Sequence, residues 1–313
     1  MRYNPFVNKS STEFISINEV GVLIIAYNRP NLLLNRVREI SNLVIPNLYI
    51  SIDGGVESHT HEMLEAIKSS QEILSGHGLK IFHYGENIGM AKHVTDTISY
   101  ILKLHDYIIV IEDDVTLSEN FVRNMIMGLS LQKSFKMYGL VSGNSHLYSH
   151  VFNNKWRATP IPSIWGWACH YKTWEGYKLD LSGYNLKFEL DNSQLWKSMS
   201  SYHKKVLLSK FTKSLQDSNY NWDSQLIFQL LRKNLCSISP IFSISGNEGF
   251  GNSKSVHTSY RKPKYIQNLK LNNRKIYKLS KYSFFYIWYD FTGIKHRIKL
   301  LIRKYVAKHK DHR

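Results

Sequence analysis

A chain of 313 residues with 43% hydrophobic side chains can bury a full-sized core, which excludes an intrinsically disordered protein. The net charge of +17 is unevenly distributed: from residue 254 onward, 17 Lys and Arg stand against two acids, a net +15 that leaves +2 for the first 253 residues. A nearly neutral body with a basic tail is not the pattern of a basic nucleic-acid-binding domain, so we expect no nucleic-acid partner.

Apolar runs alternate with stretches of helical period through the first 145 residues. The expected strands are 20–28, 48–54, 79–85, 107–114 and 137–143. The expected helices are 30–43, with Pro30 in its first turn, then 59–74, 89–104 and 118–131, the last with Ser118 as its N-cap. This alternation predicts βαβ units and therefore an α/β fold with a mainly parallel sheet, covered by helices on both faces.

The polar residues that follow the expected strands are the first candidates for a binding site. In a parallel sheet the ligand lies outside the carboxyl ends of the strands, so residues at four strand ends are expected to converge on one cleft. Two glycines after the second strand would let the backbone approach a ligand closely. These strand-end residues are Tyr27, Asn28 and Arg29, then Asp53, then Asn87, and finally Glu112, Asp113 and Asp114.

The last three of these residues form an acidic trio directly after the apolar run "YIIVI". Clustered carboxylates at the end of a buried strand raise its electrostatic cost, and a divalent cation is the simplest way to offset that cost. The alternative is a solvated turn whose acids favour the N-terminus of the next helix.

The stretch from 144 to 250 is aromatic-rich and less regular, and we expect it to complete the site. In "WGWACHYKTW", Trp165 and Trp167 either offer a ring face to a sugar or fill the core. In "NWDSQLIF", Asp223 precedes an amphipathic helical stretch and is either a helix-start residue or a catalytic acid.

The end of the chain reads as a basic amphipathic helix suited to an anionic membrane surface, or as a core-packing helix with a charged face. Lysines and arginines lie largely off its apolar stripe. The stripe consists of Ile287, Phe291, Ile294, Ile298, Leu301 and Tyr305.

No stretch approaches twenty uncharged apolar residues, and the N-terminus lacks the apolar core of a secretory signal. Cys169 and Cys236 are far apart and have no metal-like spacing. We therefore expect a cytoplasmic protein without disulfides, peripheral on the cytoplasmic face of the inner membrane.

Taken in order and spacing, seven motifs resemble those of GT-A fold nucleotide-sugar glycosyltransferases. The chain looks most like the bacterial surface-polysaccharide enzymes related to the N-acetylglucosaminyltransferase I type. The resemblance covers roughly residues 20–260, with a nucleotide half at about 18–145 and an acceptor half at about 146–260, and it leaves the extension 261–313 uncovered. The motifs are "IIAYNRP", "ISIDGG", "ENIGMAKHV", "VIEDDV", "WGWACHYKTW", "NWDSQL" and "GNEGFGNSKSVHT".

The resemblance implies a role for each matching residue. Asp114 would bind Mn²⁺ or Mg²⁺, with His257 as a further metal ligand, although the Gly-rich loop around His257 departs from the commoner family pattern. Asp223 would be the general base of an inverting transfer. Trp165 and Trp167 would contact the acceptor. The residues expected to contact the nucleotide or donor sugar are Tyr27, Asn28, Arg29, Asp53, Asn87, Lys92, Glu112 and Asp113.

These expectations describe a metal-dependent hexosyl- or N-acetylhexosaminyltransferase. Its donor would be a nucleotide sugar, a UDP-sugar by preference, and its acceptor a saccharide, lipid-linked or free, in O-antigen, capsule or related surface glycan. Two alternatives remain. A sugar nucleotidyltransferase shares the nucleotide half but needs a basic Gly-rich loop after strand one, which "AYNRPNLLL" lacks. A nucleic-acid-binding protein would use the basic tail.

Overall fold

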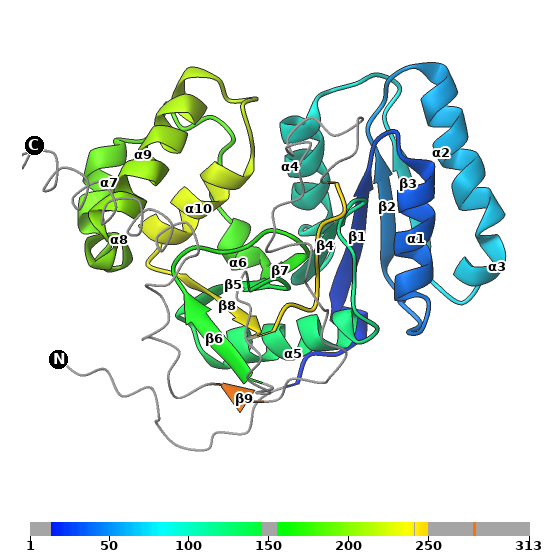
Figure 1. The fold of residues 1–313 in the computed structure, drawn as a ribbon, viewed down its shortest axis with the longest axis horizontal. Helices are drawn as coiled ribbons and strands as arrows, with labels where there is room; N and C mark the ends of the chain where they lie inside the picture. Colours follow the sequence, from blue (N-terminus) through cyan, green and yellow to red (C-terminus); the bar gives the residue numbers. More distant parts are fainter. Residues whose placement is uncertain (1–13, 146–154, 241, 250–277, 280–313) are drawn as a thin grey trace, which may run out of the picture.

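The computed structural model describes residues 14–145, 155–240, 242–249 and 278–279. These residues form one mixed sheet of nine strands in the order β3-β2-β1-β4-β7-β5-β8-β6-β9 (Figure 1). Five of the eight strand pairings are parallel and three are antiparallel. The expected α/β class with a mainly parallel sheet is therefore confirmed.

The first half of the chain consists of parallel strands connected by helices. A short 3-10 turn at Ile17–Glu19 leads into the central strand. Each strand is an apolar run, and each helix begins within a few residues of the preceding strand's end. The elements are β1 (Val20–Ala26), α1 (Pro30–Ile40), β2 (Leu48–Ile52), α2 (Glu57–Ser69), α3 (Gln71–Leu74), β3 (Leu79–His83), α4 (Met90–Ile101), β4 (Tyr107–Glu112), α5 (Phe121–Ser134) and β5 (Tyr138–Ser142).

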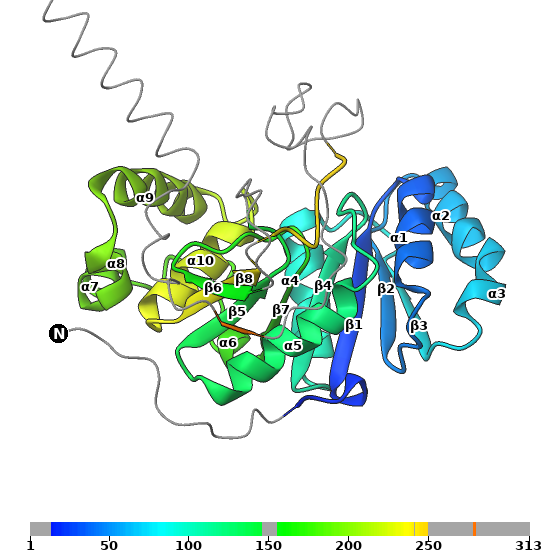
Figure 2. The same ribbon diagram turned by 60° about the horizontal axis from the view of Figure 1, so that its bottom comes forward.

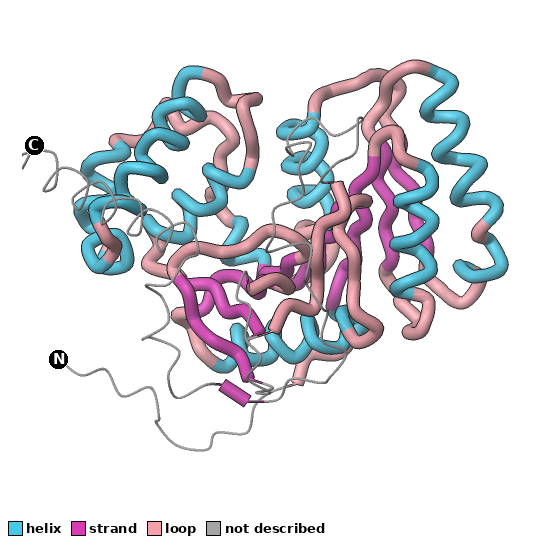
Figure 3. The backbone as a smooth tube through the Cα atoms, in the orientation of Figure 1, coloured by secondary structure: helices cyan, strands magenta, loops and turns pink. Residues whose placement is uncertain are grey.

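The second half adds antiparallel pairings and a separate group of helices. Strand β7 lies between β4 and β5 and is antiparallel to both. Figure 3 shows that the segment from α7 to α10 contains only helices and loops. The elements are β6 (Lys155–Thr159), β7 (Trp167–His170), α6 (Tyr171–Trp174), α7 (Leu186–Asn192), α8 (Gln194–Ser198), α9 (Ser201–Gln216), α10 (Asp223–Arg232), β8 (Cys236–Pro240) and β9 (Lys278–Leu279).

Both faces of the sheet are packed by helices, because successive side chains of a strand point to opposite faces. Val22 and Ile24 of β1 face α1, α2 and α5, whereas Leu23 and Ile25 face α4 and α10. A third, smaller core joins α7, α8, α9 and α10 around Phe211 and other buried side chains. Helices α7 to α10, which we call the helical group, therefore have a hydrophobic core of their own. They lie next to the carboxyl ends of the strands.

Two expected helices differ from the observed ones. The stretch 59–74 forms two helices, α2 and α3, with Ser70 between them; its hydroxyl donates to the carbonyl oxygen of Ala66 at 3.1 Å. Ser118 does not cap α5, because its N–H is held in the preceding loop by Ile244 O at 2.9 Å. The helix begins at Phe121, with Asn120 as the N-cap.

Cys169 and Cys236 are buried free thiols, as expected. None of the described helices is both long enough and apolar enough to cross a membrane. The basic amphipathic helix expected from residue 287 lies outside the described residues.

Candidate active site

A cleft of about 670 Å³ lies at the carboxyl ends of β1 and β4. The chain leaves β1 toward β2 and β3 on one side, and β4 lies on the other, so this is the point where the strand order reverses and where open α/β sheets bind ligands. The cleft gathers most of the residues that the sequence pointed to. These are Tyr27, Asn28, Arg29, Asp53, Asn87, Glu112, Asp113, Asp114, Trp165 and Asp223.

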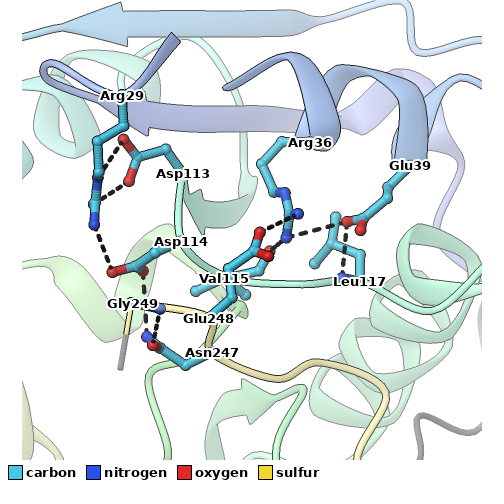
Figure 4. Close-up of polar contacts among 10 residues, drawn as sticks. All are labelled: Arg29, Arg36, Glu39, Asp113, Asp114, Val115, Leu117, Asn247, Glu248 and Gly249. Atoms are coloured by element: carbon cyan, nitrogen blue, oxygen red, sulfur yellow. Dashed lines mark hydrogen bonds and ion pairs between the residues drawn. The ribbon is translucent and has the colours of Figure 1, made fainter. Parts of the chain in front are cut away.

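Arg29 supplies a positive charge directly to the acidic trio (Figure 4). Its Nε donates to Asp113 Oδ2 at 3.1 Å, its Nη2 contacts Asp113 Oδ1, and its Nη1 donates to Asp114 Oδ2 at 3.1 Å. Burial opposes the charge of Arg29, but the two carboxylates outweigh it and raise the pKa of the guanidinium above its usual value. Arg29 therefore pairs with two of the carboxylates in the same cleft that Tyr27 and Asn28 line.

The environment also raises the pKa of two members of the trio, Glu112 and Asp113. Burial, together with the charges of Asp114 and Asp113, raises the pKa of Glu112 to about 8. Burial raises the pKa of Asp113 to about 6, although Arg29 counteracts this effect. Burial beside two other carboxylates therefore favours the protonated form of Glu112.

Asp114 is oriented by a segment far along the chain. Asn247 Nδ2 donates to Asp114 Oδ1 at 3.2 Å, and Asn247 is itself fixed by the N–H of Gly249, which donates to its Oδ1 at 2.8 Å. The N–H of Glu248 donates to the carbonyl oxygen of Asp114 at 2.8 Å. We name residues 247–249 the carboxylate clamp, since both the backbone and the side chain of Asp114 are held by it.

The carboxylate clamp is anchored in turn by Arg36 of α1, whose side chain is 1% exposed. Arg36 Nη2 lies 2.7 Å from Glu248 Oε1, and its Nη1 contacts Val115 O and lies 3.2 Å from Glu39 Oε2. The same Glu39 oxygen accepts the N–H of Leu117 at 2.9 Å. One buried guanidinium thus joins α1, the loop after β4 and the clamp.

Asp53 and Asn87 shape the opposite wall through backbone contacts. Asp53 Oδ1 accepts the N–H of Ile88 at 3.0 Å, and Asn87 Oδ1 accepts the N–H of Gly89 at 2.8 Å. The glycine after Asp53 makes room for protein instead of ligand, because a Cβ on Gly54 would lie 2.2 Å from the carbonyl oxygen of Glu86.

Asp223 is the first residue of α10, where the helix dipole favours a carboxylate. The preceding Trp222 is 2% exposed, its ring stacks on Trp167 at a centroid distance of 5.7 Å, and its carbonyl oxygen accepts the Tyr177 hydroxyl at 2.9 Å. Asn221 Nδ2 donates to Ser224 Oγ at 2.8 Å on the other side. The half-buried Asp223 is therefore held by fixed neighbours on both sides.

The structure argues against an acceptor contact for Trp167. Its side chain is fully buried, stacked between Trp174 and Trp222 on the α4 face of the sheet. Residues 165 and 167 would share a face in a regular strand, but Gly166 has φ of 67°, so the backbone turns between them. Trp165 lines the cleft, and Trp167 supports Trp222 beneath it.

Lys92 does not line the cleft. Its ammonium group pairs with Asp96 on the outer side of α4, and its side chain is 56% exposed, so it is a solvated helix residue. Met90, His93 and Val94 line the cleft instead. Their spacing of three and four residues marks one helix face, so the period of the helix could have identified them.

Three other lining residues were not among the candidates from the sequence. Asn247 lies within the Gly-rich motif "GNEGFGNSKSVHT", where only His257 was singled out, and Lys210 and Tyr220 come from the helical group, far from any strand end. His257 lies outside the described residues.

The oxygen donors present fit a hard divalent cation. Within the described ranges no group of three or more His, Cys, Asp or Glu side chains is arranged to hold a metal ion. Asp114 nevertheless offers a carboxylate of the class that Mg²⁺ and Mn²⁺ prefer. A glycine is needed at position 249, because a Cβ there would approach Asp114 Oδ2, the oxygen that Arg29 contacts, to 2.5 Å.

No protein-family model matches the sequence, and no curated protein matches it. Among solved structures, the chain is similar to the mannosyltransferase PcManGT from Pyrobaculum calidifontis in complex with GDP-Man and Mn²⁺, with a TM-score of 0.41 and 13% identity over 68% of this chain and 69% of that chain. It is also similar to the glycosyltransferase GlyE of Streptococcus pneumoniae TIGR4, with a TM-score of 0.34 and 10% identity over 70% of this chain and 45% of that chain. The function of this chain is therefore inferred from its own cleft.

Proposed function

We propose that the chain is an inverting GT-A glycosyltransferase that moves a sugar from a nucleotide-sugar donor, a UDP-sugar, to a hydroxyl group of a saccharide acceptor. The observation that supports this is the meeting of two kinds of acid in one cleft: the trio after β4 and Asp223 at the start of α10. Asp223 contributes to the raised pKa of Glu112, so the two groups are close enough to interact.

The side of the cleft that contains the acidic trio carries groups that can bind the donor. Tyr27, Asn28, Asp53 and Asn87 can contact the nucleoside, while Arg29 can donate hydrogen bonds to a diphosphate in place of the carboxylates it now holds. A divalent cation bound at Asp114 would neutralise charge on the leaving diphosphate. The clamp would keep the Asp114 oxygens aimed at that position.

The α10 side suits the acceptor. Asp223 would accept the proton of the acceptor hydroxyl as its oxygen forms a bond to the anomeric carbon and the bond from that carbon to the diphosphate breaks. Trp165 offers a ring face for the C–H side of a sugar. A single displacement of this kind inverts the anomeric configuration.

Asp114→Asn is expected to abolish most of the thermal stabilisation that UDP or a UDP-sugar produces in the presence of Mn²⁺, because the neutral amide is a far weaker cation ligand. The measurement is the melting temperature across a panel of UDP, GDP and their sugars, with and without Mn²⁺. Asp96→Asn is the matched control, since Asp96 pairs with Lys92 on the outer face of α4.

Undiminished stabilisation by the nucleotide in excess EDTA would remove the metal from this proposal. The same donor panel separates the alternatives: a transferase releases nucleoside diphosphate, whereas a sugar nucleotidyltransferase produces pyrophosphate from a sugar phosphate and a nucleoside triphosphate. A salt-sensitive shift of DNA without any nucleotide effect would favour the nucleic-acid-binding alternative.

A further inference from the structure

The formally charged side chains of helix α9 are all positive. Its sixteen residues include four lysines and no acid. None of these lysines forms an ion pair within the described part of the chain. Lys204 lies above the Trp196 ring at 5.8 Å and Lys213 above the Tyr220 ring at 5.3 Å, so aromatic faces support them while their charges remain uncompensated.

Helix α9 also exposes apolar side chains that are not part of the hydrophobic core it shares with α7, α8 and α10. Leu207 and Phe211 fill the inward face, where Phe211 packs edge-on against Phe228 of α10 at a centroid distance of 5.6 Å. Leu208 and Leu215 are 42% and 37% exposed and, seven residues apart, share one outer face. Exposed leucines flanked by lysines are the pattern of a helix lying in a membrane interface, whereas a nucleic-acid surface needs no leucine.

The position of α9 connects this surface to the cleft. Figure 2 shows α9 at the outer edge of the helical group, on the opposite side of the molecule from α1, α2 and α3. Its Lys210 and the following Tyr220 form part of the cleft lining on the Asp223 side. The lining and the leucine face therefore lie on two sides of one helix, about 10–12 Å apart.

We propose that α9 lies on an anionic phospholipid surface, with Leu208 and Leu215 at the level of the headgroups and Lys204 and Lys205, on the adjoining part of the helix, on lipid phosphates. The Asp223 side of the cleft then opens within one helix diameter of the lipid. This contact is separate from the basic extension after residue 260, and it stands whether or not the protein transfers sugars.

The first test measures whether residue 208 of α9 enters the lipid. Leu208→Cys is labelled with an environment-sensitive fluorophore in the full chain, whose two native cysteines are buried. On phosphatidylglycerol vesicles we expect a blue shift of the emission and quenching by nitroxide-labelled lipids, and neither effect on phosphatidylcholine vesicles. Lys68→Cys on α2, at a side chain 68% exposed, is the matched position and stays in water.

A charge variant supplies the second measurement. Lys204→Gln with Lys205→Gln, the two lysines one turn before Leu208, is expected to lower the vesicle partition coefficient by about 25-fold, since each lysine at an anionic surface contributes about fivefold. The control pair is Lys68→Gln with Lys92→Gln, two exposed lysines of the other half.

Three results would overturn the proposal. Vesicle binding with the residue 208 probe still in water would assign binding to the extension alone, and no binding at low salt would remove the membrane altogether. An equal blue shift on an anionic polymer such as heparin would show that α9 binds polyanions in general and has no preference for lipid. None of these three measurements depends on enzymatic activity. They therefore test the membrane contact even if the sugar-transfer proposal fails.

Discussion

Replacing Asp223 with Asn lowers kcat by an expected two to four orders of magnitude, roughly the contribution of a positioned general base. The amide has the shape of the carboxylate but cannot accept the acceptor's proton. Donor affinity stays nearly unchanged, because the donor contacts come from the ends of β1, β2 and β4. Steady-state kinetics with the donor selected by thermal stabilisation, together with a binding titration, measure both quantities.

Asp217→Asn is the control for this experiment, since it removes an exposed carboxylate directly after α9. NMR of the new linkage gives an independent check, because a single displacement produces the anomeric configuration opposite to that of the donor. A product with retained configuration would exclude the general-base role for Asp223 whatever the mutant kinetics show.

Replacing Arg36 with Met lowers the free energy of unfolding by an expected 3 kcal/mol or so, the lower end of the range for removing one partner of a buried ion pair. The guanidinium is nearly fully buried, so its loss leaves Glu248, Glu39 and the Val115 carbonyl without their shared donor. The lower end applies because the two carboxylates, 32% and 29% exposed, keep contact with water. Urea unfolding measures the change.

Arg38→Met is the matched control, because Arg38 lies on the exposed side of the same helix and its loss is expected to change stability by less than about 0.5 kcal/mol. Arg36→Lys separates charge from geometry, since an ammonium cannot reach all three oxygens in the way a planar guanidinium does. Equal stability of the Met variant and the parent would show that the pair does not hold the clamp.

Much of the nucleotide half could be predicted from the sequence. The apolar runs of β1, β2, β3 and β4 are bounded by polar residues, so the strands and their parallel arrangement could be predicted, although their order in the sheet could not. The rule that ligands lie at the carboxyl ends of strands correctly predicts that Asp53 and Asp114 line one cleft.

What could not be predicted depends on orientation and on distant contacts. The positive φ of Gly166 separates Trp165 from Trp167, and residue types alone do not reveal it. The phase of α4, which turns Lys92 outward and His93 inward, becomes fixed only when the helix packs on the sheet. The contact of Arg29 with Asp113 was not predicted, because it follows from the adjacency of β1 and β4.

The pairing of Arg36 with Glu248 spans 212 positions of the chain. During synthesis on the ribosome, α1 leaves the exit tunnel long before the clamp has been made, and the early strands can already pair. Until residue 247 emerges, Asp114 lacks the amide that turns its carboxylate and the N–H that holds its carbonyl. A nascent or prematurely ended chain can therefore contain the paired strands β1 to β4 while Asp114 still lacks its partners in the carboxylate clamp.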